Sequence, residues 1–196
     1  RNCNTIHEMS LDVGQEENLK IVGKGGKRLV WKPLEFDGAV KALKMFQYRP
    51  DREDDFGPVS IELQRRDAII HELTASSPYT VNMFGYCSTS AVYDFGDGGH
   101  MQENILRDGP IPRDDLLRIA HRVASSVADV HNFDDSGRAT VVHSDIHGQQ
   151  WMKVKGEYQL TDFNLAKFLK RSKKKIKKLK RKIKKKIIIY LIRLET

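Results

Sequence analysis

Two aspartates in the stretch VVHSDIHGQQWMKVKGEYQLTDFN, residues 141–164, have a spacing that could build a paired catalytic site. Asp145 follows a short His-Ser turn, and Asp162 follows the segment YQLT. Between them, two short apolar segments flank a turn at Gly156, which is the pattern of a β-hairpin. Because a hairpin folds the chain back, Asp162 should return toward the loop that carries Asp145. One carboxylate could then orient a nucleophile while the other holds a metal ion.

The residues around both aspartates resemble two loops of eukaryotic-type protein kinases. HSDIHGQQ is similar to the catalytic loop HRDLxxxN, and TDFN is similar to the metal-binding loop DFG. The resemblance implies that Asp145 is the catalytic base and that Gln150 and Asp162 bind magnesium. The positions that depart from the family pattern are Ser144, His147, Gln150 and Asn164.

A glycine-rich segment, NLKIVGKGGKRLVWK, predicts a second hairpin near the start of the chain. Backbone amides without side chains can approach phosphate oxygens closely, although an ordinary glycine turn has the same sequence pattern. The segment resembles the kinase loop GxGxxGxV, with Arg28 at the third glycine position. The resemblance implies that Gly23, Gly25 and Gly26 cover the phosphates of ATP and that Val30 belongs to the same site.

Lys44 is a lysine inside an otherwise apolar strand, AVKALKMF, which resembles the VAIK strand of kinases. The resemblance implies that Lys44 holds the α- and β-phosphates during catalysis. Since an unpaired ammonium is costly to bury, Lys44 either meets a charged partner or points to solvent, as Lys41 is expected to do. A helix is predicted over residues 59–73, and its Asp67 lies nearest the position of the acid that pairs with the kinase lysine. A solvent-facing carboxylate is the alternative for Asp67.

The segment SAVYDFGDGGHM resembles the fifth strand and the hinge of kinases. On that resemblance Tyr93 is the gatekeeper, and Asp94, Phe95 and Gly96 offer backbone groups to adenine, with His100 near the ribose. Recognition by main-chain atoms demands no particular side chain, so a plain strand and turn would have the same pattern.

The segment DDLLRIAHRVASSVADVHN, residues 114–132, is the clearest predicted helix. Acidic residues come at its start, and apolar residues recur at helical spacing. The stripe expected to pack against the core is Leu116, Leu117, Ala120, Val123, Ala124, Val127 and Val130. In the kinase resemblance this helix leads into the catalytic loop.

The net charge of +8 comes from one segment, because 14 of the 34 Lys and Arg lie in residues 167–186, where there is no acid. The other 20 are outnumbered by 26 Asp and Glu, so only the tail could contact nucleic acid. Cys3 and Cys87 form neither a disulfide framework nor a metal-type pair, so a reducing, intracellular and cytoplasmic location is expected. No apolar run reaches the roughly 18 residues of a membrane span.

The lysine-rich tail has Ile176, Leu179, Ile183 and Ile187 at helical spacing. This pattern suits a basic amphipathic helix on an anionic membrane, a nucleic acid or an acidic protein. A solvated charged tail, or the translation of non-coding sequence rich in adenine, are the alternatives.

The expected fold is α+β and kinase-like, with an antiparallel-sheet lobe that carries one helix and an incomplete helical lobe. The expected boundaries are an irregular lead-in over 1–17, the sheet lobe over 18–95, the start of the helical lobe over 96–168 and the tail over 169–196.

Several functions fit these residues. The resemblance implies an enzyme, an ATP-dependent protein kinase that uses Mg²⁺ and an unknown protein substrate, as a fragment with weak or no activity. The departures in the two catalytic loops also fit a pseudokinase or interaction module. HSDIHGQQ further resembles HGDLHxxN of aminoglycoside and choline phosphotransferases, with His147 at their second histidine. Metal binding by His143, Asp145 and His147, as in calcineurin-like metallophosphoesterases, is rejected because the later metal motifs of that group are missing.

Overall fold

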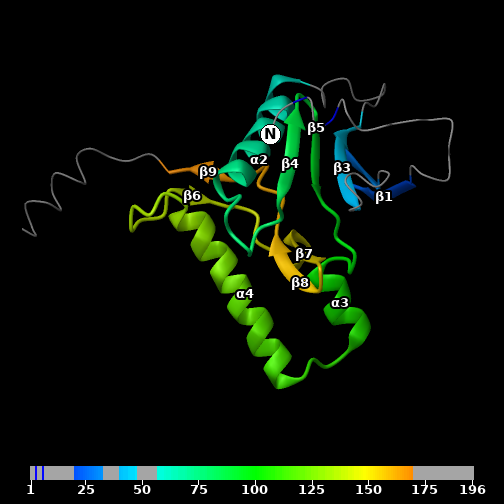
Figure 1. Cartoon of the computed structure of the whole chain (residues 1–196), viewed down its shortest axis with the longest axis vertical. Coiled ribbons are helices and arrows are strands. Elements are labelled where there is room, and N and C mark those ends of the chain that lie inside the picture. The colour runs from blue at the N-terminus through cyan, green and yellow to red at the C-terminus, as the bar shows by residue number, and fades with distance from the viewer. Residues whose placement is uncertain (1–2, 4–5, 7–19, 33–39, 48–56, 170–196) are drawn as a thin grey trace, which may run out of the picture.

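The computed structural model describes Cys3, Ile6 and residues 20–32, 40–47 and 57–169. These residues form an α+β structure with a five-stranded antiparallel sheet at one end and two helices with short strands at the other (Figure 1). The expected α+β class is therefore confirmed, and its assignment to the kinase fold stays a prediction.

The sheet has the strand order β1-β2-β3-β5-β4. Its strands are β1 (Lys20–Lys24), β2 (Arg28–Lys32), β3 (Lys41–Phe46), β4 (Met83–Cys87) and β5 (Ser90–Asp94). The predicted glycine-rich hairpin is β1 and β2, whose turn is closed by the Gly25 amide donating to the Arg28 carbonyl at 2.8 Å. In the register of the sheet Lys44 of β3 lies between Val30 of β2 and Ala91 of β5, so it is held in the middle of the sheet.

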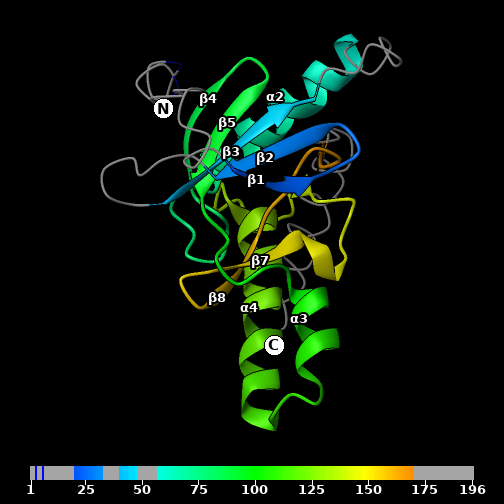
Figure 2. The same ribbon diagram turned by 90° about the vertical axis from the view of Figure 1, so that its right-hand side faces the viewer.

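Helix α2 (Pro58–Leu73) lies beside β4 and β5, as both views show (Figures 1 and 2). Its first residue is a proline, which fits the first turn because that position needs no amide donor. The buried residues are Ser60, Gln64, Asp67, Ala68, Ile70 and His71. The apolar spacing located the helix correctly but not its buried face, because Ile61 and Leu73 are exposed and four of the buried side chains are polar.

The remaining elements form the second half of the described chain. They are α3 (Met101–Asp108), α4 (Arg113–Asn132), β6 (Val141–Val142), the 3₁₀ turn η2 (Gly148–Gln150), β7 (Trp151–Val154), β8 (Glu157–Leu160) and β9 (Lys167–Phe168). Figure 2 shows α3 and α4 below the sheet. The predicted hairpin is β7 and β8, joined by Lys155 and Gly156, whose φ angles of 52° and 83° suit the two-residue turns of hairpins.

Helix α4 packs with only part of the predicted apolar stripe, because Val123, Val127 and Val130 lie in or against the core, together with Ile119, which was not in the stripe. Leu116 and Leu117 are 52% and 60% exposed, while Ser126 and Val130 are buried. The buried Ser126 hydroxyl accepts a hydrogen bond from the Trp151 indole nitrogen at 3.0 Å, which ties α4 to β7. The core at this place contains Ile70, Val130, Val141, Trp151, Tyr158, Leu160, Phe163 and Ala166. A polar residue at the contact therefore replaces part of the expected apolar stripe.

The expectation for Lys41 and the expectation for the two cysteines were both wrong. Lys41 does not point to solvent: it is 6% exposed, with Nζ 3.8 Å from Asp94 and 3.3 Å from the centre of the Phe84 ring. Cys3 and Cys87 form a disulfide, contrary to the reduced state that was taken as the default. The bond attaches the start of the chain to β4, and neither cysteine is a free thiol.

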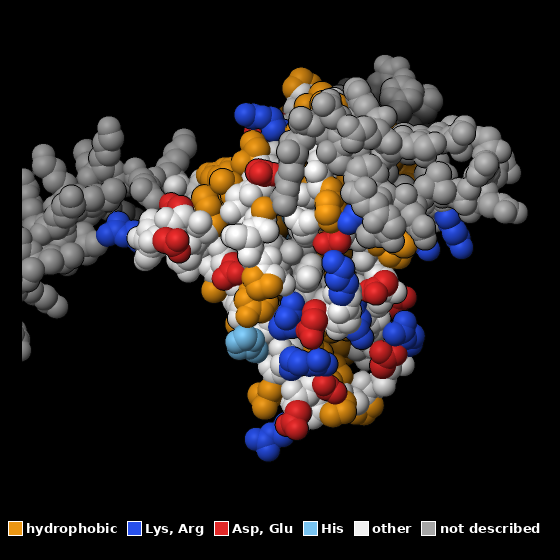
Figure 3. Space-filling view, viewed as in Figure 1, with side chains coloured by type: hydrophobic (Ala, Val, Ile, Leu, Met, Phe, Trp, Pro, Cys, Tyr) orange, Lys and Arg blue, Asp and Glu red, His pale blue; other side chains and the backbone are white. Residues whose placement is uncertain are grey.

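The surface over α3, α4, β7 and β8 carries acidic and basic side chains interspersed (Figure 3). None of the helices within the described ranges has the length and apolarity needed to cross a membrane. The predictions for the lysine-rich tail concern residues outside the described part, as do most of those for the lead-in.

Candidate functional site

A cleft of about 700 Å³ lies under the β1–β2 hairpin, a size typical of sites for small ligands. Its walls come from the hairpin, β3, the segment after β5, the start of α3 and the loops around β7 and β8. The predicted site residues that line it are Gly23, Gly25, Gly26, Val30, Lys44, Tyr93, Asp94, Phe95, Gly96, Gln150 and Asp162. Asp67 and Asp145 are not in this lining.

Lys44 is paired with two of the predicted acids, Asp162 in the cleft wall and Asp67 beneath it. Its Nζ lies 3.2 Å from Asp162 Oδ1 and 3.6 Å from Asp67 Oδ2, and its side chain is 15% exposed. Asp67 and Asp162 are far apart in the sequence, so the fold brings β3, α2 and the loop after β8 to one point. Lys44 therefore does not point to solvent, which was the alternative.

Asp67 is fully buried below the cleft and holds several groups in place. Its carboxylate accepts hydrogen bonds from the Phe163 amide at 2.6 Å and from the Tyr93 hydroxyl at 3.1 Å. Burial raises the pKa of Asp67, but nearby Lys44, then His71 and Arg28, outweigh burial and hold the pKa well below its usual range. Asp67 is thus a charged carboxylate that anchors Lys44 and the loop at Phe163.

Arg28 is a member of this cluster that the sequence analysis did not assign to the site. Its Nη1 lies 3.4 Å from Asp67 Oδ2 and 3.4 Å from Asp162 Oδ1. The signal available in the sequence was its place in the glycine-rich pattern, where a glycine is expected. A large cationic side chain at the first position of β2 reaches the floor of the cleft, which a glycine could not do.

His71 and Tyr93 form the buried floor beside Asp67. The His71 Nδ1 lies 2.9 Å from the Val81 carbonyl, so Nδ1 carries the proton and donates. Burial lowers the pKa of His71 to about 4, because the opposing attraction of Asp67 is partly cancelled by Lys44. Burial, followed by the charge of Asp67, raises the pKa of Tyr93 well above its usual value. Both groups are therefore neutral at physiological pH.

Asp145 lies in the loop between β6 and η2 and is held by its neighbours. Gln150 Nε2 donates to Asp145 Oδ2 at 2.8 Å, and His147 Nε2 lies 3.5 Å from the same oxygen. The preceding Ser144 has a φ of 66°, a left-handed conformation that turns the chain sharply before the carboxylate. Since Gln150 lines the cleft, it connects Asp145 to the cavity.

Asp162 returns toward the loop of Asp145 as predicted, and three contacts hold the two loops together. The Thr161 amide donates to the Gln150 carbonyl at 2.9 Å, and His143 Nε2 donates to the Thr161 carbonyl at 3.0 Å. Strands β6 and β9 pair outside both loops and close the segment at its base. His143 is 2% exposed, and its ring nitrogen is used in this link.

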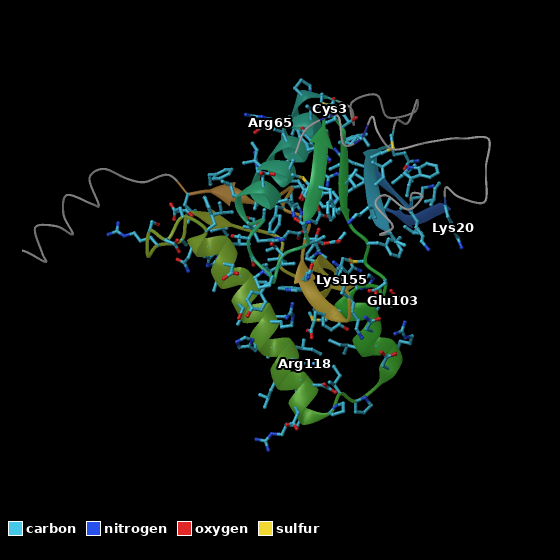
Figure 4. All side chains as sticks on the ribbon, in the orientation of Figure 1. Cys3, Lys20, Arg65, Glu103, Arg118 and Lys155 are labelled. Atoms are coloured by element: carbon cyan, nitrogen blue, oxygen red, sulfur yellow. A yellow bond between two sulfur atoms is a disulfide. The ribbon has the colours of Figure 1, made fainter. Side chains whose placement is uncertain are left out.

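The predicted adenine end of the cleft is formed by the chain that leaves β5. The Asp94 amide already donates to the Asn82 carbonyl at 3.0 Å, and its carboxylate lies 3.8 Å from the Lys41 ammonium. Apolar cleft walls come from Ala42 and Met152, two residues that the sequence analysis did not name. In Figure 4, Lys20 of β1 and Glu103 of α3 lie on the same side of the molecule, above and below this end.

The donor set for magnesium does not fit as arranged. Asp162 Oδ1 faces an ammonium and a guanidinium, and the amide nitrogen of Gln150 is bonded to Asp145. In the described residues no three His, Cys, Asp or Glu side chains gather as metal ligands. Magnesium sites usually combine carboxylate oxygens with phosphates, and here one carboxylate is shared by two cations.

No family model matches this chain. A curated protein from Arabidopsis thaliana, Protein SUPPRESSOR OF NPR1-1 CONSTITUTIVE 4, is 27% identical over 163 residues. The similarity covers 78% of this chain but 13% of that protein, so this chain spans a small part of its relative.

Proposed function

We propose that this chain is a kinase-like nucleotide-binding domain whose activity, where present, is phosphoryl transfer from ATP to a protein hydroxyl. The observation that carries the proposal is the position of Lys44 at the wall of the cleft, paired with Asp162 and Asp67 beneath a glycine-rich hairpin. A lysine fixed by two carboxylates from separate elements is a preorganised partner for phosphate. The resemblance in three sequence motifs, in the same order along the chain, supports the same reading.

Each group has a role in such a transfer. Lys44 neutralises phosphate oxygens, and the amide of Gly26 approaches them from above, since the Gly25 amide already donates to the Arg28 carbonyl. Asp145 accepts the proton of the hydroxyl as its oxygen forms a bond to the γ-phosphorus, and the bond from that phosphorus to the bridging oxygen breaks, which releases ADP. Positioning and charge neutralisation supply most of the catalysis in this class of reaction.

Weak activity, or binding without catalysis, is favoured by the contacts of two aspartates. Asp145 is held by Gln150 and His147, which both contact Oδ2, so one of its two carboxylate oxygens is already occupied. Asp162 is shared between Lys44 and Arg28. The second candidate function is therefore a nucleotide-binding interaction module that recruits a protein partner without transferring phosphate.

Thermal unfolding with and without ATP tests the proposal. We expect ATP to raise the melting temperature and Lys44→Met to abolish the rise, because the ammonium that meets the phosphates is gone. Arg118→Ala is the matched control: Arg118 lies on α4, pairs with Asp115 at 3.1 Å and is far from the sheet in Figure 4. Absence of any shift with ATP, with or without Mg²⁺, would contradict the nucleotide site.

A phosphoryl-transfer assay separates the two candidates. We expect slow transfer or none to a generic protein substrate, and any transfer should be lost in Asp145→Asn. Rapid transfer by the unmodified chain would contradict the proposed weakness of the enzyme.

A further inference from the structure

Arg28 places a permanent positive charge where the glycine-rich pattern has no side chain. It is the first residue of β2, directly after the hairpin turn, and its side chain is 10% exposed. An arginine keeps its charge at any pH at which the protein is folded. Its position is therefore a fixed feature of the cleft.

Arg28 and Lys44 contact the same two oxygens. Both cations lie within 3.6 Å of Asp67 Oδ2, and both lie within 3.4 Å of Asp162 Oδ1. Two cations and two carboxylates alternate, so the charges of the cluster cancel. A divalent cation at Asp162 Oδ1 would have to approach two positive groups and displace one of them.

The hairpin turn adds further positive charge above this cluster. Lys24 and Lys27 both line the cleft, and Lys27 Nζ donates to Ser60 Oγ at 3.1 Å. Of the acids in the lining, Asp94 lies at the opposite end and faces Lys41 and Lys155. The phosphate end of the cleft is thus cationic from its own side chains.

We propose that this cleft binds the phosphates of a nucleoside triphosphate without a divalent cation, with Arg28 and Lys44 supplying the charge that a metal would supply. This inference rests on the proposed nucleotide site. The planar guanidinium can direct two N–H groups at one phosphate, which an ammonium cannot do. Asp67 retains Lys44 as a partner when Arg28 turns toward the ligand.

Titration calorimetry with ATP in excess EDTA and in excess Mg²⁺ tests the inference. For the unmodified chain we expect dissociation constants in the two conditions to agree within about threefold, or to favour EDTA. Arg28→Gly should weaken binding in EDTA by at least about tenfold and recover part of the loss with Mg²⁺, because Asp162 then faces one cation, Lys44, and not two. A tenfold change in the dissociation constant corresponds to ~1.4 kcal/mol of binding free energy.

Two further variants separate charge from structure. Arg28→Lys keeps the charge and should retain most of the binding in EDTA, even where Arg28→Gly loosens β2. Arg65→Ala removes one positive charge from the exposed face of α2, where Arg65 pairs with Glu62 at 3.2 Å, and should change nothing (Figure 4). The melting temperature of each variant without ligand reports whether it is folded.

The outcomes distinguish this inference from the proposed function. ATP binding by the unmodified chain that requires Mg²⁺ would overturn metal-free binding and leave the nucleotide site standing. Equal loss of EDTA binding in Arg65→Ala and Arg28→Gly would also overturn it, since the effect would then be general charge. No binding of ATP in either condition would overturn the proposed site and this inference together.

Discussion

Asp67, on α2, joins four other segments of the described chain. It contacts Arg28 of β2, Lys44 of β3, Tyr93 of β5 and the backbone amide of Phe163. Its type and order in the chain could be predicted from the family resemblance, but its complete burial could not. Burial became possible because two cations and two neutral donors from other elements satisfy the carboxylate, and sequence spacing does not report such distant partners.

Replacing Asp67 with Asn should lower the free energy of unfolding by about 3 kcal/mol, since two partly buried cations lose a fully buried partner. Chemical denaturation at pH 7 measures the change. Glu62→Gln is the matched control on the same helix: Glu62 is exposed and pairs only with Arg65 at 3.2 Å among the described contacts, so its loss should cost at most about 0.5 kcal/mol. Similar costs for the two variants would contradict the role assigned to Asp67.

His71 should make stability depend on pH. Its pKa is about 4 in the folded chain, mainly through burial, and about 6.5 in the unfolded chain. The unfolded state therefore binds the proton more tightly between these values. The contribution of His71 is fully present above pH 6.5, and we expect a loss of about 2 kcal/mol when the pH falls from 7 to 5. The low pKa of Asp67 acts in a separate window, below about pH 4.

Denaturation curves at several pH values measure this loss, and His71→Gln should flatten the slope between pH 7 and pH 5. A glutamine amide can still donate to the Val81 carbonyl, so the comparison isolates the titration. Nuclear magnetic resonance titration of the His71 ring in the folded protein gives a direct reading, and a midpoint near 6.5 would contradict the mechanism.

At the scale of elements, α2 shows what the sequence could predict and what it could not. Its position, the two hairpins and α4 were predicted because periodicity and glycine turns are local signals. The buried face of α2 was not predicted, and that of α4 was predicted only in part, because polar residues such as Ser60, Asp67 and Ser126 occupy them. A prediction from apolar periodicity is correct only where the core is apolar. In this chain a polar cluster lies at the contact between α2 and the five-stranded sheet.

Gln64 is the weakest point of that polar face. It is 1% exposed, and among the described residues neither its amide nitrogen nor its amide oxygen has a hydrogen-bond partner. Gln64→Met keeps the length of the side chain and removes both unsatisfied groups, so we expect a gain of about 1–2 kcal/mol in unfolding free energy. Chemical denaturation measures it, with the exposed Gln102→Met as a control. A loss of stability would show that Gln64 is satisfied in solution.

At the scale of the whole molecule, the disulfide connects the start of the chain to the edge of the sheet. Cys3 and Cys87 are 84 positions apart, so the bond restricts a long stretch of the unfolded chain. Reduction should therefore lower the free energy of unfolding by about 3–4 kcal/mol. The double variant Cys3→Ser, Cys87→Ser should be as unstable as the reduced protein and insensitive to dithiothreitol. Titration of thiols in denatured, unreduced protein should find none, and two thiols would contradict the bond.

The same bond closes a covalent ring that contains α2 and the strands β1 to β4, while β5 lies just outside it. A protease that cuts the backbone once between residues 3 and 87 consequently cannot separate the two pieces. They would migrate as one band on a denaturing gel run without reductant and as two bands after reduction.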